Sequence, residues 1–154
     1  MAKRAKIGDV IEIKLNKGVS YAIYTHKNNM YGPLLRVFNR IYMERPTDFN
    51  TLFSAAPTFS YFFPLGAAVS RGIVTIVVNI TVPVHMQDFP IFRTGTPNPV
   101  TNKVSNWWLW DGENEWCVGE ITQEQRKLSI LGIVNDTYLA EKIESGWTPE
   151  NDVR

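Results

Sequence analysis

The chain has 154 residues, of which 44% are hydrophobic and 20% are charged, and its formal net charge is +1. These values are typical of one globular domain, here residues 1–154, and they exclude a wholly disordered chain. No segment has the apolar core of a signal peptide or the length of a transmembrane helix, and the single Cys117 excludes an internal disulfide framework, so we expect a cytoplasmic protein without membrane contact.

The first third of the chain predicts an antiparallel meander of three strands. Apolar and charged residues alternate over residues 11–15, which is the pattern of a half-buried strand with Glu12 on its solvent face. A turn at residues 16–18 leads to a second strand over residues 19–26, and residues 34–39 continue the meander. Because these pairings are sequential, an antiparallel sheet is the simplest arrangement.

The pattern weakens over residues 42–70. Asp48 is expected to cap a short helix through Phe53, because its carboxylate can accept hydrogen bonds from the free amides of a first turn. An aromatic cluster follows, made of Phe59, Tyr61, Phe62 and Phe63. With three prolines in the same region, we expect these aromatic residues to form an irregular segment that lies against the core.

Residues 74–82 give the strongest strand pattern. Their β-branched residues favour an extended backbone and alternate with polar ones. We therefore expect one face to hold Val74, Ile76, Val78, Ile80 and Val82. Prolines then break the chain into a loop-rich passage, which Phe89, Ile91 and Phe92 are expected to anchor to the core.

The last third predicts a second hairpin and a helix. Residues 107–110 and 115–121 flank an Asp-Gly turn, and Asn135 is suited to cap a helix through Ser145 that Gly146 would end. The whole pattern predicts a mainly β fold of the α+β class. We expect a twisted antiparallel, partly barrel-like sheet with a short C-terminal helix.

The sequence holds no recognisable motif for catalysis, a cofactor or a metal. Cys117 lies mid-strand, where we expect a buried structural thiol, and His26 and His85 have no ligand-type neighbours at the spacing of a metal site. Phosphate-binding glycine loops and the serine-hydrolase elbow are absent from the sequence. We therefore expect a non-enzymatic protein without a cofactor. An enzyme would instead need a pocket that joins one of the two histidines to a carboxylate of perturbed pKa.

The charge is distributed unevenly between the two ends. Residues 1–45 hold nine Lys and Arg against three acidic residues, whereas residues 111–154 hold ten acidic residues against four Lys and Arg. Such asymmetry can steer association with a charged partner. The alternative is that the two ends lie near each other and partly neutralise.

The acidic end is the better candidate for a binding site. Its carboxylates cluster around the second hairpin, beside four tryptophans, and continue on the outer face of the C-terminal helix. Acidic groups can complement a basic partner, and a tryptophan can anchor an interface. The candidate binding residues are Asp111, Glu113, Glu115, Glu120, Glu141, Glu144 and Trp110. We expect most of the other tryptophans to lie in the core and one or two to be exposed.

A small nucleic-acid-binding β module is the alternative interpretation. The basic, aromatic surface available for it would consist of Lys3, Arg4, Lys6, Lys14, Lys17, Tyr21 and Tyr24. The competing explanation is a solubilising basic tail with tyrosines packed inside the sheet. The net charge lacks the basic excess of such modules, which favours the competing explanation, so direct contact with nucleic acid is not expected.

Three ordered segments resemble members of the immunity protein 26 family. They are KIGDVIEIKLNKGVSYAIY at residues 6–24, NWWLWDGENEWCVGEIT at 106–122 and GIVNDTYLAEKIESGWTPENDV at 132–153. The resemblance implies a mostly β bacterial cytoplasmic protein that binds a cognate polymorphic or contact-dependent toxin domain, for example a nuclease, and protects its producer without a cofactor. The resemblance brings no catalytic residue to this chain and does not identify the interface.

Overall fold

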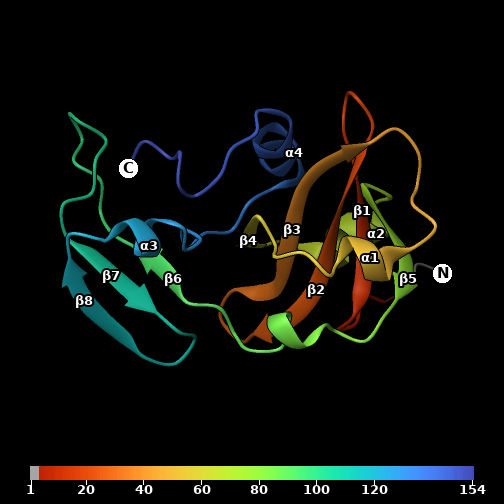
Figure 1. The fold of residues 1–154 in the computed structure, drawn as a ribbon, viewed down its shortest axis with the longest axis horizontal. Coiled ribbons are helices and arrows are strands. Elements are labelled where there is room, and N and C mark those ends of the chain that lie inside the picture. The colour runs from red at the N-terminus through yellow and green to blue at the C-terminus, as the bar shows by residue number, and fades with distance from the viewer. Residues whose placement is uncertain (1–3) are drawn as a thin grey trace.

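The computed structural model describes residues 4–154 and contains two antiparallel sheets with a few short helices (Figure 1). The five-stranded sheet has the order β4-β3-β2-β1-β5, with β1 at Asp9–Lys14, β2 at Val19–Asn28, β3 at Gly32–Tyr42, β4 at Phe59–Phe62 and β5 at Val74–Asn79. The three-stranded sheet has the order β6-β7-β8, with β6 at Phe92–Thr94, β7 at Trp107–Trp110 and β8 at Glu115–Gly119. The helices are α1 at Phe49–Leu52, α2 at Leu65–Ser70, the 3-10 helix η1 at Val84–Met86, α3 at Gln123–Arg126 and α4 at Asp136–Glu144.

The predicted fold class is confirmed, although the sheets do not close into a barrel. The first two strands, the third strand of the meander and the second hairpin form where they were expected. Within residues 4–154, no helix has both the length and the apolar character needed to cross a membrane.

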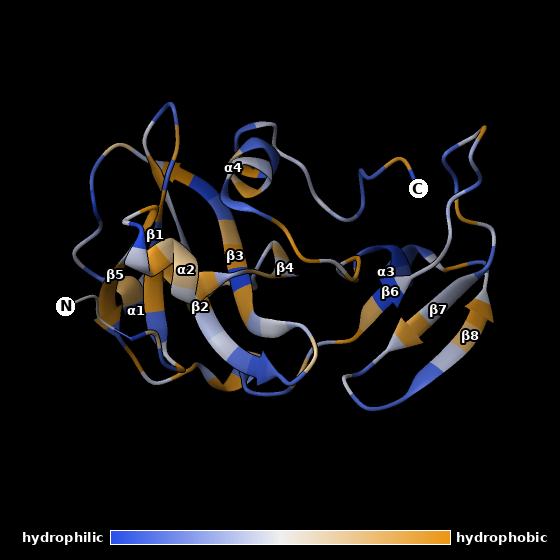
Figure 2. Cartoon of the chain, turned by 180° about the vertical axis from the view of Figure 1, so that it is seen from behind, coloured by the Kyte–Doolittle hydropathy of each residue, from blue (hydrophilic) through white to orange (hydrophobic). Residues whose placement is uncertain are grey.

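Both faces of the five-stranded sheet are covered, so β1 is buried on both sides. Ile11 packs into one core with α2 and α4, whereas Val10 packs into a second core with Tyr21 and with residues near α1 and η1. Figure 2 shows the apolar residues of β1, β3 and β5 that supply much of these cores. Glu12, expected on a solvent face, is only 8% exposed because the second core covers that face. Arg45 forms a salt bridge with its carboxylate at 2.8 Å.

The prediction that Val74, Ile76, Val78, Ile80 and Val82 share one face is wrong. The pairing of β1 with β5 shifts register between Val10 and Ile11, which places an extra residue in β5. Ile76 therefore packs with one core and Val77 with the other, while Val78 is 38% exposed. The strand also ends at Asn79, before the end of the predicted range.

The aromatic segment after α1 is regular, contrary to the prediction. Phe59–Phe62 forms β4, which pairs with β3 along its full length. Its predicted packing against the core is confirmed, because all four of its residues are buried. The loop-rich passage likewise contains β6. Its first residue, Phe92, is fully buried as predicted, whereas Ile91, directly before the strand, is 38% exposed, so the prediction that Ile91 anchors the passage to the core is wrong.

A connecting segment, residues 129–134, joins the two sheets. Its backbone exchanges two hydrogen bonds of 2.9 Å with Arg93 of β6 and two of 3.0 and 3.1 Å with Phe62 of β4, in parallel bridges. An aromatic cluster packs at the same junction and consists of Tyr31, Phe62, Phe89, Phe92 and Trp110. The two sheets are therefore joined by both backbone bonds and apolar contacts.

Helix α4 forms as predicted. The side chain of Asn135 caps it by accepting a hydrogen bond from the backbone N–H of Tyr138 at 2.7 Å. Leu139 and Ile143 form the expected apolar stripe and are buried against the five-stranded sheet. Gly146 follows the helix with a φ of 71°, a conformation that favours glycine.

Candidate functional site

The acidic residues of the β7–β8 hairpin differ in what they do. Asp111 accepts hydrogen bonds from the backbone N–H groups of Asn114 and Glu113 at 2.7 and 2.9 Å, and these bonds lower its pKa. Its carboxylate therefore shapes the turn. Glu113, Glu115 and Glu120 are exposed and form no ion pair with any residue of the described range 4–154. Their charges are available to a partner.

Two of the hairpin tryptophans are half-exposed and lie on opposite faces of the small sheet. Trp108 pairs with Cys117 across the ladder, and Trp116 pairs with Leu109, so alternation sends the two indoles to different sides. Each is 37% exposed. The sheet thus presents a large aromatic side chain on each face, within reach of the acidic residues. One or two exposed tryptophans were expected, and this is confirmed.

Trp110 is placed differently from the other candidate residues. Its ring lies 5.4 Å from Tyr31 and 5.4 Å from Phe89, between ring centroids, in the aromatic cluster that joins the two sheets. Most of the indole surface of Trp110 therefore packs against other residues of this protein. This packing gives Trp110 a role in stability whether or not its free edge meets a partner.

Cys117 is exposed, so the prediction of a buried thiol is wrong. The reason is that β8 is an edge strand of its sheet, where side chains have fewer neighbours than in a central strand. The sulfur lies 3.1 Å from the side-chain oxygen of Asn106, to which the thiol donates. This position makes Cys117 a useful reporter of the β8 surface.

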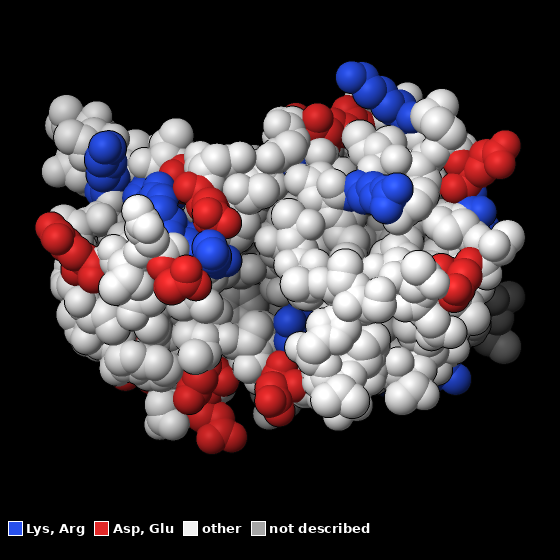
Figure 3. All heavy atoms as spheres, viewed as in Figure 1, with Lys and Arg blue, Asp and Glu red and all other residues white. Residues whose placement is uncertain are grey.

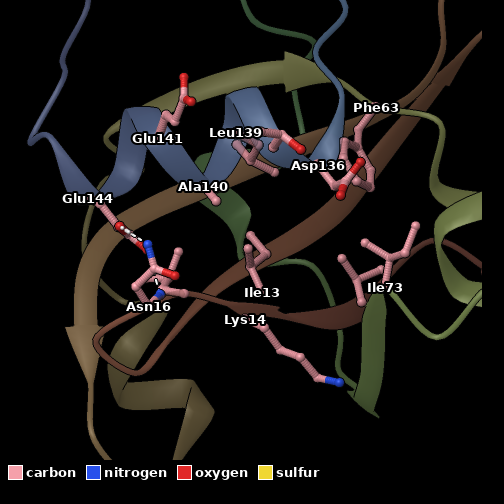
Figure 4. A pocket seen from close by; sticks show the side chains of 13 residues that line it. Ile13, Lys14, Asn16, Phe63, Ile73, Asp136, Leu139, Ala140, Glu141 and Glu144 are labelled. Atoms are coloured by element: carbon pink, nitrogen blue, oxygen red, sulfur yellow. Dashed lines mark hydrogen bonds between the residues drawn. The ribbon is translucent and has the colours of Figure 1, made fainter.

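The acidic residues of α4 form a separate surface. Glu144 accepts hydrogen bonds from the backbone N–H of Asn16 at 2.6 Å and from its side-chain amide at 3.2 Å, which ties α4 to the β1–β2 turn. Figure 4 shows Glu144 pointing toward Asn16, whereas Glu141 points away from the pocket that they line. The pocket has a volume of about 450 Å³ and is bounded by α4, β1 and Ile73.

The structure does not bring the two halves of the predicted site together. In Figures 1 and 2, α4 lies on the five-stranded sheet and the turn of the β7–β8 hairpin lies apart from it, in the other sheet. Figure 3, which has the same view as Figure 1, shows acidic and basic side chains interspersed over the visible face rather than one continuous acidic patch. The carboxylates of the hairpin and those of α4 are therefore two candidate surfaces.

Sequence reasoning missed a pair of buried cations near the C-terminal segment, residues 147–154. Arg93 is fully buried, donates to the carbonyl oxygen of Pro149 at 2.7 Å and has one terminal nitrogen, Nη1, without a hydrogen-bond partner. Burial lowers its pKa to about 10. Lys142 of α4 is 6% exposed, with its ammonium 3.8 Å from the ring centroid of Trp147. Only the position of Arg93 directly after the apolar residues 89–92 hints at this arrangement in the sequence.

Asp152 holds the C-terminal segment in place. Its carboxylate accepts hydrogen bonds from the Arg154 guanidinium at 2.9 and 3.0 Å and from the Trp147 indole at 3.0 Å. Burial acts to raise the pKa of Asp152, but the hydrogen bonds from Arg154 and Trp147 outweigh burial and lower it. This part of the acidic end is structural.

The rings of both histidines have hydrogen-bond partners within the protein. The ring nitrogens of His26 lie 2.8 Å from the Thr25 hydroxyl and 2.9 Å from the carbonyl oxygen of Gln87, and burial lowers its pKa. His85 contacts the carbonyl oxygen of Ala55 at 3.0 Å. Across residues 4–154, no three His, Cys, Asp or Glu side chains are grouped closely enough to hold a metal ion.

The aromatic part of the alternative nucleic-acid surface is buried. Tyr21 and Tyr24 are 0% and 5% exposed, and the Tyr21 hydroxyl donates to Glu12 at 2.7 Å. The expectation that these tyrosines pack inside the sheet is confirmed. Lys14 and Lys17 are exposed, and Lys3 lies outside the described residues.

Comparisons with known proteins give no family assignment. No family model, no curated protein and no solved structure matches the chain.

Proposed function

We propose that this chain is a bacterial immunity protein that binds the domain of a cognate polymorphic or contact-dependent toxin in the cytoplasm and neutralises it by stoichiometric inhibition. The observation that carries the proposal is the surface of the β7–β8 hairpin, where exposed carboxylates without ion-pair partners among residues 4–154 lie beside two half-exposed tryptophans. The ordered segments that resemble the immunity protein 26 family support the same function.

The chemistry of the hairpin suits capture of a basic protein surface. Unpaired carboxylates raise the rate at which an oppositely charged partner is captured, and an indole that loses its remaining exposure can anchor the complex. A nuclease presents basic groups to the phosphates of its substrate. In the proposed complex, Glu113 and Glu115 would take the place of those phosphates. Inhibition then follows from occupation of the surface and needs neither catalysis nor a cofactor.

Three of the candidate residues already contact other groups within the protein. Asp111 and Glu144 are engaged by backbone and side-chain donors, and Trp110 is largely enclosed by aromatic neighbours. The proposed contact residues are therefore Glu113, Glu115 and Glu120, with Trp108 and Trp116. Glu141, on α4, is the free carboxylate of the separate surface.

Glu120 has a mixed environment. It lines a pocket of about 360 Å³ together with Lys103 and Arg126, although it forms no ion pair with either. Its charge is therefore partly offset by neighbours, and we expect Glu113 and Glu115 to contribute more to the attraction.

Calorimetric titration with the toxin domain encoded beside this chain's gene tests the function. We expect one-to-one binding with a dissociation constant of about 100 nM or lower, together with loss of the toxin's activity. Lysozyme, an unrelated basic protein, serves as the control for non-specific attraction. Two folded proteins that release no heat and leave the toxin active would contradict the proposal.

A further inference from the structure

The outer edge of β8 is free. This strand is the last of the order β6-β7-β8 and pairs only with β7. Across residues 4–154, no backbone hydrogen bond joins its outer side to another element, and Figures 1 and 2 show β8 at the rim of the molecule. A free edge presents N–H and C=O groups that a strand of another chain can use.

The hydrogen-bonding pattern between β7 and β8 indicates which backbone N–H and C=O groups of β8 point away from β7. At the hairpin turn the N–H of Asp111 donates to the carbonyl of Asn114 at 3.1 Å. Hydrogen-bonded and non-hydrogen-bonded pairs alternate in an antiparallel ladder. Glu115 is therefore in a non-hydrogen-bonded pair, Trp116 in a hydrogen-bonded pair and Cys117 again in a non-hydrogen-bonded pair. The backbone groups of Glu115 and Cys117 consequently point away from β7.

The β-bulge that interrupts this edge lies at its far end, where the ladder shifts register between Trp107 and Trp108 and Val118 is the extra residue. Proteins commonly shield free edges with lysine or proline, and Glu115–Gly119 contains neither. Its charges are acidic instead, with Glu115 at the start of the strand and Glu120 directly after its end. Antiparallel pairing with a second copy of β8 would bring these carboxylates together, and like charges across a ladder are destabilising. The charges therefore favour a basic strand of a different protein.

We propose that β8 is the docking edge for an extended, basic strand of the toxin domain, which adds to the small sheet as its fourth strand. This inference rests on the proposed function and deepens it. Main-chain bonds to Glu115 and Cys117 provide affinity, as in other cases of strand addition. A lysine or arginine opposite Glu115 and an apolar side chain beside Trp116 provide specificity.

A matched pair of variants at one position tests the main-chain bonds. Cys117→Pro and Cys117→Ala both remove the thiol, but only the proline removes the outward N–H, at an edge position where proline is tolerated. We expect Cys117→Pro to weaken calorimetric binding of the toxin domain about tenfold and Cys117→Ala to change it less than about twofold. Near-UV circular dichroism and thermal melting establish that both variants are folded. Equal affinities of the two folded variants would overturn the edge model and leave the proposed function standing.

A second measurement does not depend on the toxin or on a variant. The wild-type protein is titrated with a seven-residue peptide of alternating lysine and valine, and the matched control is a peptide of alternating glutamate and valine. We expect only the basic peptide to shift the amide resonances of β8 and to slow hydrogen exchange at Glu115 and Cys117. No response at β8, or the same response to both peptides, would overturn the edge model. Failure of the wild-type protein to bind the toxin domain contradicts the proposed function instead.

Discussion

The guanidinium of Arg93 stacks on the indole of Trp107, with its central carbon 4.4 Å from the ring centroid. The same side chain donates to the carbonyl oxygens of Pro149, Leu128 and Arg126 at 2.7, 3.3 and 3.4 Å. None of these partners is a carboxylate. One buried arginine therefore connects the small sheet to the chain after α3 and to the C-terminal segment.

Replacing Arg93 should weaken the fold. Arg93→Met keeps much of the side-chain volume but leaves buried carbonyl groups without donors, so we expect a loss of about 2–4 kcal/mol in the free energy of unfolding. Urea denaturation followed by tryptophan fluorescence measures it. Arg71→Met is the matched control because Arg71 is exposed, and it should change stability by less than about 0.5 kcal/mol. Equal midpoints for the two variants would contradict a stabilising role of Arg93.

Two tryptophans of β7 should differ sharply in their effect on stability. Trp110→Ala opens a cavity in the aromatic cluster between the sheets and should cost about 3–5 kcal/mol, whereas Trp108→Ala removes a half-exposed side chain and should cost about 1 kcal/mol. Chemical denaturation compares them. A similar small loss for both would mean that the indole of Trp110 is free to serve a partner in the way that we assign to Trp108.

The stability of the protein should fall in acid partly through Glu12. Hydrogen bonds from Arg45 lower the pKa of Glu12, burial opposes this, and the Tyr21 hydroxyl adds to the lowering. Because the folded pKa lies below the unfolded value of about 4.3, this stabilisation is fully present above that pH and is lost as pH falls through the folded pKa. Glu12→Gln should therefore lose about 1–3 kcal/mol at pH 7 and less at pH 3. Melting curves of both proteins from pH 7 to pH 3 measure the difference, and a loss that stays constant over this range would contradict the assignment.

Charge-reversal variants should distinguish which of the two acidic surfaces binds the toxin domain. We expect Glu113→Lys with Glu115→Lys to slow association with the toxin domain by about tenfold or more at low salt, and the effect should shrink as salt is added. Glu141→Lys is the matched control on α4 and should leave association nearly unchanged. Stopped-flow kinetics measures both. The reverse ranking of the variants would assign the interface to α4.

Local signals in the sequence were sufficient to predict several strands, a turn and a helix. The alternation before Asn16, the Asp-Gly turn and the Asn135 cap each act over a few residues, and the corresponding strands, turn and helix formed where predicted. Non-local pairings were not accessible in this way. The register shift between Val10 and Ile11 changes the face to which later residues of β5 point. It arises from the pairing with β1, so periodicity within β5 cannot reveal it.

The residue types of the candidate site could be predicted from the sequence, but their contacts and their exposure could not. The sequence shows that carboxylates and tryptophans gather after residue 105, yet it does not show that Glu144 is bonded to Asn16 or that Trp110 is enclosed. The exposure of Cys117 follows from the edge position of β8, which depends on the order of strands in the sheet. The burial of Arg93 depends on residues more than thirty positions away.

The connecting segment, residues 129–134, has a consequence for biosynthesis. On the ribosome, β4 and β6 are made before the segment that bonds to Phe62 and Arg93, so both strands keep an open edge until residues 129–134 have been made. Helix α4, which covers one face of the five-stranded sheet, is made later still. Nascent chains halted before residue 129 should therefore recruit chaperones more strongly than chains that have passed residue 146.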